Sequence, residues 1–485
     1  MDRAGRSRRR LSRRQSFLLK PKDLSVRLTH LFYRMIPCRL HPLLGLLLAA
    51  LPGAFLSAQA PVLPEQLFPQ LDGFLRHSAT QSPRMISRGL DLEMADATRD
   101  AYRAGLWPSV SGSYRISETR DDRADQPDTL RAQKVYYDIT INQAVFHWGA
   151  VRNNARIGDI QLRIAQGNFR EGYRLLAQEI RSQYLQLIVK KAQIARSRFN
   201  MVHVRELLRV AEDRLAKRAI SEGEVAVARL NVEQAELLLD RQADDFEASR
   251  SAFARFTGSA TPLSADEIPD SIPALTPGQG VFDAALASVL SASTVPTNEA
   301  RNYQNYIDLE VLNYKMNRVR LLPKVNLIAG ANQDEQSYTI NTAQRYRLDS
   351  IYGAMQVSWH IFDGFAARSA QRTALARRRQ LENDLRNYTE NIKASLQAQN
   401  RQIAFAARAM ALTDRNVNGS DGLLKSRRED LRSGQASEAD VRVAELAVHD
   451  AKISAYASRL DYLMKASELN GLLAQDPALA NLPQE

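Results

Sequence analysis

Two short acidic motifs are the residues best placed to do chemistry in this sequence. Ser221-x-x-Glu224 and Ser437-x-x-Asp440 each put a hydroxyl three residues before a carboxylate. At the start of a helix this spacing forms a capping box, in which the two side chains satisfy each other's backbone amides. The helix dipole also favours an acid in the first turn. Capping is therefore the simplest interpretation of both motifs, and a further role needs support from the surrounding architecture.

The other reactive side chains form no catalytic or metal-binding pattern. Five histidines follow residue 60, and no two have metal-ligand spacing: His77, His147, His203, His360 and His449. The sequence has no H-E-x-x-H, no phosphate-binding glycine loop and no G-x-S-x-G. Cys38 is the only cysteine. We therefore expect no catalytic residues, no cofactor and no metal site.

The net charge of +12 suggests nucleic acid at first, but it is unevenly distributed. Residues 1–60 contain twelve Lys/Arg and two acids, so most of the net charge belongs to this segment. A nucleic-acid interface needs clustered basic residues on the folded part of the chain. The remainder is close to neutral, and we expect no nucleic-acid partner.

Residues 1–60 have the form of a signal peptide or leader. A basic stretch precedes an apolar run over 43–56 and an A-x-A site that ends at Ala60. A membrane anchor is the alternative, but the run has about 14 residues where roughly 20 are needed. Pro52-Gly53 also interrupts it. We predict cleavage after Ala60 and export, with translation starting at Met1 or Met35.

The chain also contains an internal duplication, in which motifs of the first half return in the second half at nearly one offset. Leu106-Trp107-Pro108-Ser109-Val110 returns as Leu321-Leu322-Pro323-Lys324-Val325, and two further boxes return in the same order. Ordered boxes at one offset indicate a repeat. A proline-rich joint separates the halves. We therefore divide the chain into the leader (1–60), a first repeat (61–270) and a second repeat (271–485).

Each repeat contains two segments in which apolar and polar residues alternate, which predicts strands. They start near Val110 and Val135 in the first repeat and near Val325 and Met355 in the second, where the last strand extends to Ile361. Such strands fit a membrane barrel with a wet lumen, or equally a half-buried soluble hairpin. Polar loops over 118–133 and 333–349 join them into two hairpins.

The rest of each repeat predicts helices, because long stretches lack proline. We expect helices over 84–105, 149–217, 222–257, 299–319, 364–432 and 437–470. The segment from Gly149 to Lys217 has about 68 residues and would be roughly 100 Å long. Such a rod must lie against other rods, so the shorter helices are expected to run beside it. Within the last long helix, Asn418–Gly422 looks like a loop and predicts a kink or an unwound turn.

This repeated order of helix, hairpin and long helical hairpin resembles the TolC-like outer membrane efflux and secretion proteins. The matching motifs are the Leu106–Val110 box, the stretch from Val357 to Gly364 and the turn from Ser437 to Ala444. The resemblance implies a mainly α-helical fold with a membrane β-barrel. In the homotrimer that it implies, each chain gives four strands to a 12-strand barrel, continued by a long helical periplasmic tunnel. Open sheet edges, which lipid does not tolerate, independently favour closure between copies.

The same resemblance implies an outer-membrane exit duct of a tripartite efflux or type I secretion system. The duct would be passive, gated at its periplasmic end, and located in the outer membrane with an extension into the periplasm. Its partners would be outer membrane lipid, a periplasmic adaptor and an inner-membrane pump, either ABC or proton-driven. The alternative is an extracytoplasmic coiled-coil scaffold or adhesin without a pore, which the four alternating strands disfavour.

The resemblance also implies a site at the periplasmic tips. The tip turns are expected at Arg218, Ser221, Gly434 and Ser437. The family narrows its tunnel with acidic residues there, and Glu224 and Asp440 fall on matching positions. In a trimer each acid would form a ring of three, which favours cations. Val227 and Val443 occupy positions where a second acid is frequent, which argues against a double ring.

All three tryptophans lie at predicted junctions between strands and helices. They are Trp107, Trp148 and Trp359. If these junctions share one membrane level, the indoles form an aromatic belt. Ordinary packing is the alternative for Trp148 and Trp359.

Overall fold

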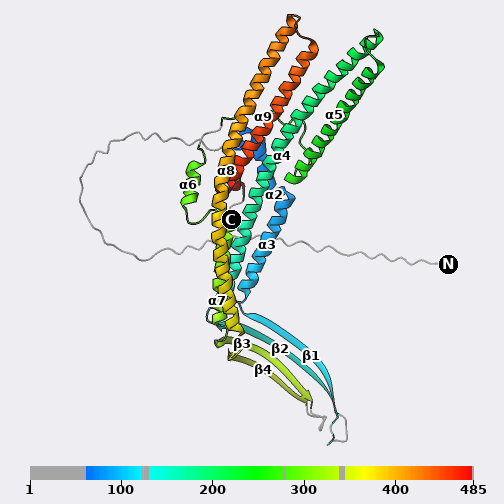
Figure 1. Ribbon diagram of the computed structural model, residues 1–485. Helices are drawn as coiled ribbons and strands as arrows, with labels where there is room; N and C mark the ends of the chain where they lie inside the picture. Colours follow the sequence, from blue (N-terminus) through cyan, green and yellow to red (C-terminus); the bar gives the residue numbers. More distant parts are fainter. Residues whose placement is uncertain (1–61, 123, 125–129, 277–279, 338–344, 483–485) are drawn as a thin grey trace, which may run out of the picture. The chain divides into compact units, whose positions relative to one another are not determined.

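The computed structural model of the chain (Figure 1) describes residues 62–122, 124, 130–276, 280–337 and 345–482. The predicted leader over 1–60 and its cleavage site lie outside the described residues, as do the central parts of both hairpin loops.

Helices and strands follow the expected order in both halves. The first half contains α1 (Pro64–Leu67), α2 (Pro69–Gln81), α3 (Pro83–Ala104), β1 (Ser109–Asp121), β2 (Leu130–Phe146), α4 (Ala150–Ala216) and α5 (Glu222–Thr257). The second contains α6 (Asp283–Ser291), α7 (Asn298–Arg318), β3 (Lys324–Ser337), β4 (Arg345–Ser358), α8 (Ala366–Arg432), α9 (Glu438–Leu472) and a 3-10 helix, η1 (Pro477–Asn481). The short elements α1, α2, α6 and η1 were not predicted.

The four strands form one antiparallel sheet in the order β1-β2-β3-β4. The two predicted hairpins are confirmed, and β2 pairs with β3 to join them. The predicted end of the last strand is wrong, because β4 ends at Ser358 and not at Ile361. Lys324 opposes Ser358 at the end of the ladder, and the preceding Pro323 has no amide to continue it. Both β1 and β4 are edge strands within the chain.

The sheet has one apolar and one polar face, as the alternation predicts. Across the strands the register aligns Val110 with Ile141 and Leu327 with Met355. These apolar side chains are largely exposed, up to 92% at Ile351. On the other face, the Thr140 hydroxyl lies 3.0 Å from that of Tyr352. Such a face of exposed aliphatic side chains is unusual in a protein surrounded only by water.

The two long helices, α4 and α8, have 67 residues each, roughly 100 Å at 1.5 Å per residue. α4 packs against α3 and α5, and α8 against α7 and α9, while α4 also contacts α7 and α9. α8 is helical through Asn418–Gly422, so the predicted unwound turn is wrong. Two glycines cost only about 1 kcal/mol each in a helix, which the rest of α8 outweighs. None of the described helices is long and apolar enough to cross a membrane.

The main core surrounds the middle of α4, where α2, α5, α9 and η1 converge. Tyr173, Tyr184 and Phe253 are fully buried there. Burial raises the pKa of Tyr184 to about 12. This core holds the two halves of the chain together, and both helical hairpins extend from it (Figure 1).

Arg181 lies in this core with no exposed surface. Its guanidinium donates to both oxygens of Asp476, at 2.8 Å each, and to Glu65 at 2.6 and 3.0 Å. It also donates to the Ser467 hydroxyl at 2.8 Å. Burial alone would lower the pKa of Arg181, but the bonds and charges of Asp476 and Glu65 outweigh it and raise that pKa. The network fastens α1 and the start of η1 to α4.

Candidate functional site

The chain reverses direction at two tip turns, between α4 and α5 and between α8 and α9, at the ends of the long helices away from the sheet (Figure 1). At the first tip Arg218 has φ +58°, and its amide donates to Leu215 at 2.8 Å. At the second, Gly434 has φ +77°, and its amide donates to Leu431 at 3.1 Å. Both helices therefore end in one left-handed residue, at equivalent positions of the two repeats.

Each return helix begins with a complete capping box. In the first, the Glu224 carboxylate accepts from the Ser221 amide at 2.8 Å, and the Ser221 hydroxyl accepts from the Glu224 amide at 3.4 Å. In the second, the Asp440 carboxylate accepts from the Ser437 amide at 2.8 Å and from its hydroxyl at 2.7 Å. The structure thus places both acids in the first turn of their helices, at the tips.

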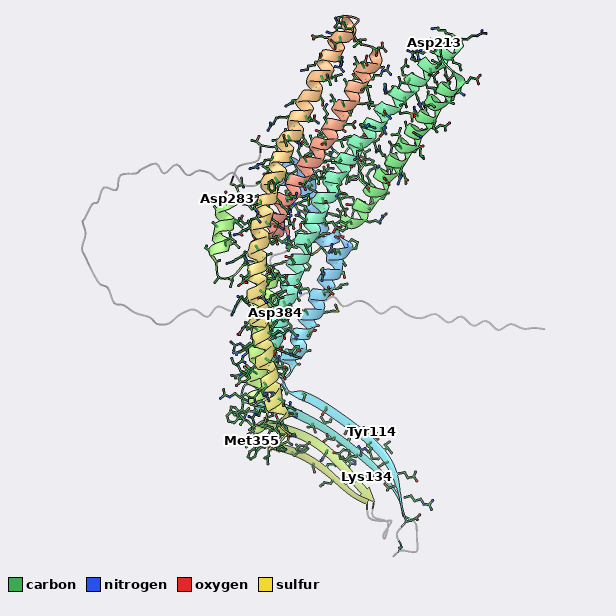
Figure 2. All side chains as sticks on the ribbon, in the orientation of Figure 1. Tyr114, Lys134, Asp213, Asp283, Met355 and Asp384 are labelled. Atoms are coloured by element: carbon green, nitrogen blue, oxygen red, sulfur yellow. The ribbon has the colours of Figure 1, made fainter. Side chains whose placement is uncertain are left out.

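The carboxylates at the tips are exposed to solvent. Hydrogen bonds from the Ser437 hydroxyl and then its amide hold the pKa of Asp440 below its ordinary value. On the first tip, the Lys217 ammonium 2.7 Å from Asp213 lowers the pKa of that carboxyl. Figure 2 labels Asp213 near this tip. Within one chain, the Asp440 carboxylate is therefore held by Ser437 in its ionised form and is exposed to the surroundings.

Apolar side chains follow the acids on both return helices. Val227 is 59% exposed and Val443 is 58% exposed. Each lies three residues beyond the capping acid, which is nearly one turn of helix. Each tip therefore presents a capping carboxylate followed by an exposed valine.

The three tryptophans lie where helices and strands join. Trp107 precedes β1, Trp148 lies between β2 and α4, and Trp359 between β4 and α8. The indole of Trp148 donates to the Pro323 carbonyl at 2.7 Å, and that of Trp359 to Leu321 at 3.0 Å. Both bonds fasten the loop before β3 and fix the two rings, while all three indoles remain substantially exposed.

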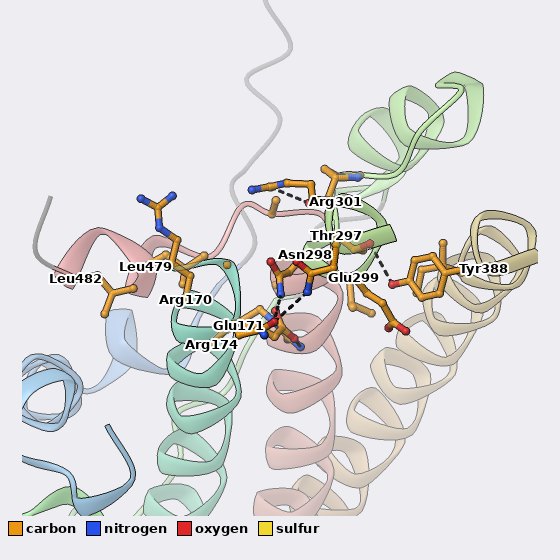
Figure 3. A pocket seen from close by; sticks show the side chains of 18 of the residues that line it. Arg170, Glu171, Arg174, Thr297, Asn298, Glu299, Arg301, Tyr388, Leu479 and Leu482 are labelled. Atoms are coloured by element: carbon orange, nitrogen blue, oxygen red, sulfur yellow. Dashed lines mark hydrogen bonds and ion pairs between the residues drawn. The ribbon is translucent and has the colours of Figure 1, made fainter. Parts of the chain in front are cut away.

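A cavity of about 810 Å³ lies where α4, the start of α7, α8 and the end of α9 meet (Figure 3). Arg174 is paired with Glu171 at 2.7 Å, and the Tyr388 hydroxyl donates to Thr297 at 3.0 Å. Sequence analysis did not find this cavity, because its lining comes from segments that lie far apart in the chain. Arg301 donates to the Pro296 carbonyl at 3.1 Å, and we regard the cavity as a packing gap between the repeats.

Within the described residues, no group of three or more His, Cys, Asp or Glu side chains could hold a metal ion. The arrangement offers exposed carboxylates at the helical tips and a sheet with one apolar and one polar face. Such surfaces can bind ions, lipid or another protein chain.

Residues 74–259 match the model of one protein family, described as "Outer membrane efflux protein". Among solved structures, the chain resembles the outer-membrane channel OprN, with a TM-score of 0.65, 14% identity and coverage of 86% of this chain and 93% of that one. It also resembles the CmeC outer membrane channel of Campylobacter jejuni (TM-score 0.63, 12% identity, coverage 85% and 90%). A third is the open state of the MtrE outer membrane channel of Neisseria gonorrhoeae (0.61, 13%, 86% and 91%). No curated protein sequence matches the chain.

Proposed function

We propose that this chain is a TolC-like outer membrane efflux protein and forms a passive duct that receives cargo from an inner-membrane pump through a periplasmic adaptor. The family consists of outer membrane channels that extend into the periplasm, not of enzymes. We further propose that three copies form the duct, as part of a tripartite efflux or a type I secretion system. The pump, ABC or proton-driven, would supply the energy.

The sheet is the observation that carries this proposal. One of its faces is covered with exposed aliphatic side chains, and the outer edges of β1 and β4 pair with no other strand of the described part of the chain. Lipid tolerates such a face but not such edges, because unpaired backbone groups cannot be solvated there. Closing several sheets edge to edge satisfies both conditions and leaves the polar face around a lumen. A coiled-coil scaffold needs no such sheet.

The tryptophans support one membrane level at the strand–helix junctions. We propose that Trp107, Trp148 and Trp359 form the periplasmic aromatic belt of the barrel. They are the only tryptophans in the chain, so intrinsic fluorescence reports on them alone. Lipids brominated near the headgroup should quench all three more strongly than lipids brominated at the chain ends. If a water-soluble quencher quenches all three tryptophans to the same extent and neither brominated lipid quenches them, the belt is ruled out.

The tips support a gate at the periplasmic end. We propose that three copies of Asp440, and to a smaller extent of Glu224, converge at the mouth of the tunnel. Like charges close together repel. In a ring, some of the three Asp440 carboxylates would therefore have a higher pKa than the Asp440 carboxylate has in a single chain. A negative ring at the mouth would favour cations over anions.

Reconstitution tests the duct directly. The mature protein, extracted in detergent from the outer membrane and added to a planar lipid bilayer, should produce discrete ion conductance. A scaffold or adhesin would be recovered without detergent and would leave the bilayer silent. Stable extraction without detergent, together with a silent bilayer, would contradict the proposal.

A further inference from the structure

The edges of the chain carry surfaces that nothing in its described part covers. The helices follow the order of the strands, with α3 and α5 at one edge and α8 at the other. On α8, Phe405 is 63% exposed and Leu412 is 60% exposed. On α5, Leu230 is 51% exposed and Leu237 is 71% exposed. Each pair is spaced seven residues apart, which aligns its members along one side of a helix.

A charged residue follows each of these apolar residues after three positions. On α8 the pattern is Phe405-x-x-Arg408 and Leu412-x-x-Arg415. On α5 it is Leu230-x-x-Glu233 and Leu237-x-x-Asp240. The two edges therefore have the same pattern with opposite charge. Arg401 continues the basic row on α8, and Asp244 continues the acidic row on α5.

The helix geometry lets these rows meet. Three residues advance by about 300°, so each charged row lies roughly 60° behind its apolar row. When two antiparallel helices bring their apolar rows together, rows displaced in the same rotational sense fall on the same side of the contact. The arginines of an α8 edge would then lie beside the acids of an α5 edge.

The heights along the tunnel also agree. α4 and α8 both have 67 residues between the sheet and the tips, so the two tips are level. Arg415 lies 17 residues before the end of α8, and Asp240 lies 18 residues after the start of α5. Leu423 and Leu230 are matched in the same way, closer to the tips. Each pair differs in height by only about 1.5 Å, the rise of a single helical residue.

These charged side chains have no use within the chain. Arg408, Arg415, Asp240 and Asp244 are all exposed. In the part of the chain that the structure describes, none of the four has a hydrogen bond or ion pair with another side chain, whereas Glu236 on the same helix pairs with Arg205. Arg415 matches Asp240 in height within about 1.5 Å, and Arg408 matches Asp244 within about 3 Å, so these four exposed charges remain available to a partner.

Two glycines on α8 provide a second, independent indication. Gly419 and Gly422 are helical, and a Cβ on either would meet no atom within 4 Å. Alanine would fit both positions and would favour the helix by about 1 kcal/mol each. Both glycines lie on the exposed side. Gly419 is within about 3 Å of Leu237 in height, and Gly422 is within about 3 Å of Leu230. Their missing side chains leave a flat place on which a second helix could approach closely.

We propose that the α8 edge of one copy binds the α5 edge of a second copy along this antiparallel seam. Apolar residues form its centre, Arg415 and Arg408 face Asp240 and Asp244 along one side, and Gly419 receives Leu237. This inference rests on the proposed closed assembly and names the surface that closes its helical part. Lipid headgroups are a poor alternative partner, because Arg408 lies roughly 60 Å along α8 from the sheet.

Disulfide cross-linking tests the register of the seam. Beyond the leader the chain has no cysteine, so Leu230→Cys with Leu423→Cys introduces a single pair. Mild oxidation of the membrane-embedded protein should convert most of the chain into covalently linked dimers and trimers. The control is Leu230→Cys with Phe405→Cys, both exposed apolar positions on the same edges but about 28 Å apart in height. The control should stay at background.

The outcomes separate the seam from the duct. Absent cross-linking in a complex whose mass is three chains overturns the seam and leaves the duct standing. A monomeric complex contradicts both. Cross-linking of Leu423→Cys to a different protein, with no linked copies of this chain, overturns the choice of a second copy as the partner.

Charge exchange tests the rows. Arg415→Glu and Asp240→Arg should each reduce several-fold the fraction of oligomer that survives mild SDS, and the double variant should recover most of it. Arg377→Glu is the matched control, because Arg377 is equally exposed but lies on nearly the opposite side of α8. Equal losses in the double and single variants would overturn the pairing.

Discussion

The two long helices have the same length and equivalent places in the two repeats, but they differ in burial. α4 buries nineteen residues, while α8 buries six. Burial also differs at single equivalent positions: Arg181 and Tyr184 of α4 are fully buried, whereas α8 has Gln397 and Asn400 there, neither of them buried. α4 has neighbours on both sides, and α8 has them on one.

This difference shows that a duplicated backbone does not fix the environment of its side chains. Both repeats keep the same cap and a left-handed turn residue at the same place, because these depend on local geometry. The residues along the sides of the two helices differ: more of them are buried on α4, which has neighbours from the same chain on both sides, and they are mostly exposed on α8. α8 is therefore as long as α4, but no helix in the described part of the chain packs against its exposed side.

The largest expected effect is at Arg181. Arg181→Ala leaves the buried Asp476 and the partly buried Glu65 without their cationic partner, which should lower the free energy of unfolding by about 3–5 kcal/mol. The equivalent change on α8, Gln397→Ala, removes only an exposed side chain and should stay within about 0.5 kcal/mol. Thermal unfolding in detergent measures both. Equal effects of the two changes would contradict the assignment of α4 as the buried helix.

The tips should show a smaller and opposite pair of effects. Arg218 adopts a left-handed conformation that glycine adopts without strain, so Arg218→Gly should stabilise the first tip by about 1 kcal/mol. Gly434→Ala should destabilise the second tip by about 1–2 kcal/mol. Hydrogen exchange of the amides at each tip reports the local change. A change of the same sign in both variants would mean that the turns are not equivalent.

The contact of α4 with α9 should weaken in acid. His203 on α4 is buried, and its burial and then the nearby Arg442 lower its pKa. The unfolded chain therefore takes up the proton first as the pH falls below about 6.5, and the folded form loses stability from there to the lower folded pKa. Hydrogen exchange of α9 at pH 7 and pH 5 should show faster opening in acid. His203→Gln should flatten this dependence; an unchanged pH dependence in the variant would assign it to other groups.

The smallest effect on the fold should come from Asp440→Asn. The side-chain amide oxygen of asparagine can still accept from the Ser437 amide, so the free energy of unfolding should change by less than about 1 kcal/mol, the effect of an acid in the first turn. In planar bilayers, however, the variant should lose much of its preference for cations, because the ring charge is gone. Glu224→Gln should change selectivity less. If a correctly assembled Asp440→Asn channel keeps its preference for cations, Asp440 acts only in the capping box.

Local signals in the sequence predicted the helices and strands well. The predicted helix 222–257 coincides with α5, because Ser221 caps one end and Gly258, with φ +80°, terminates the other. The wrong boundary at Ile361 and the wrong unwound turn at Asn418–Gly422 both came from patterns that the surrounding structure overrides.

Long-range contacts could not be predicted in this way. α2 is stable because Leu71 and Leu75 pack in the core around α4, and nothing in its own short sequence shows this. The carboxylate partners of Arg181 are 116 and 295 residues away. The seam residues on α5 and α8 became visible only when the structure showed which sides of these helices the chain leaves exposed.

The mass of the complex extracted in detergent tests the central claim most directly. The sheet edges and the exposed side of α8 are each incomplete in one chain, and both would be covered if copies close into a ring. Native mass spectrometry of the extracted mature protein should give three chains, with no appreciable monomer. A stable, folded single chain in detergent would contradict the account, because one four-stranded sheet cannot close a barrel.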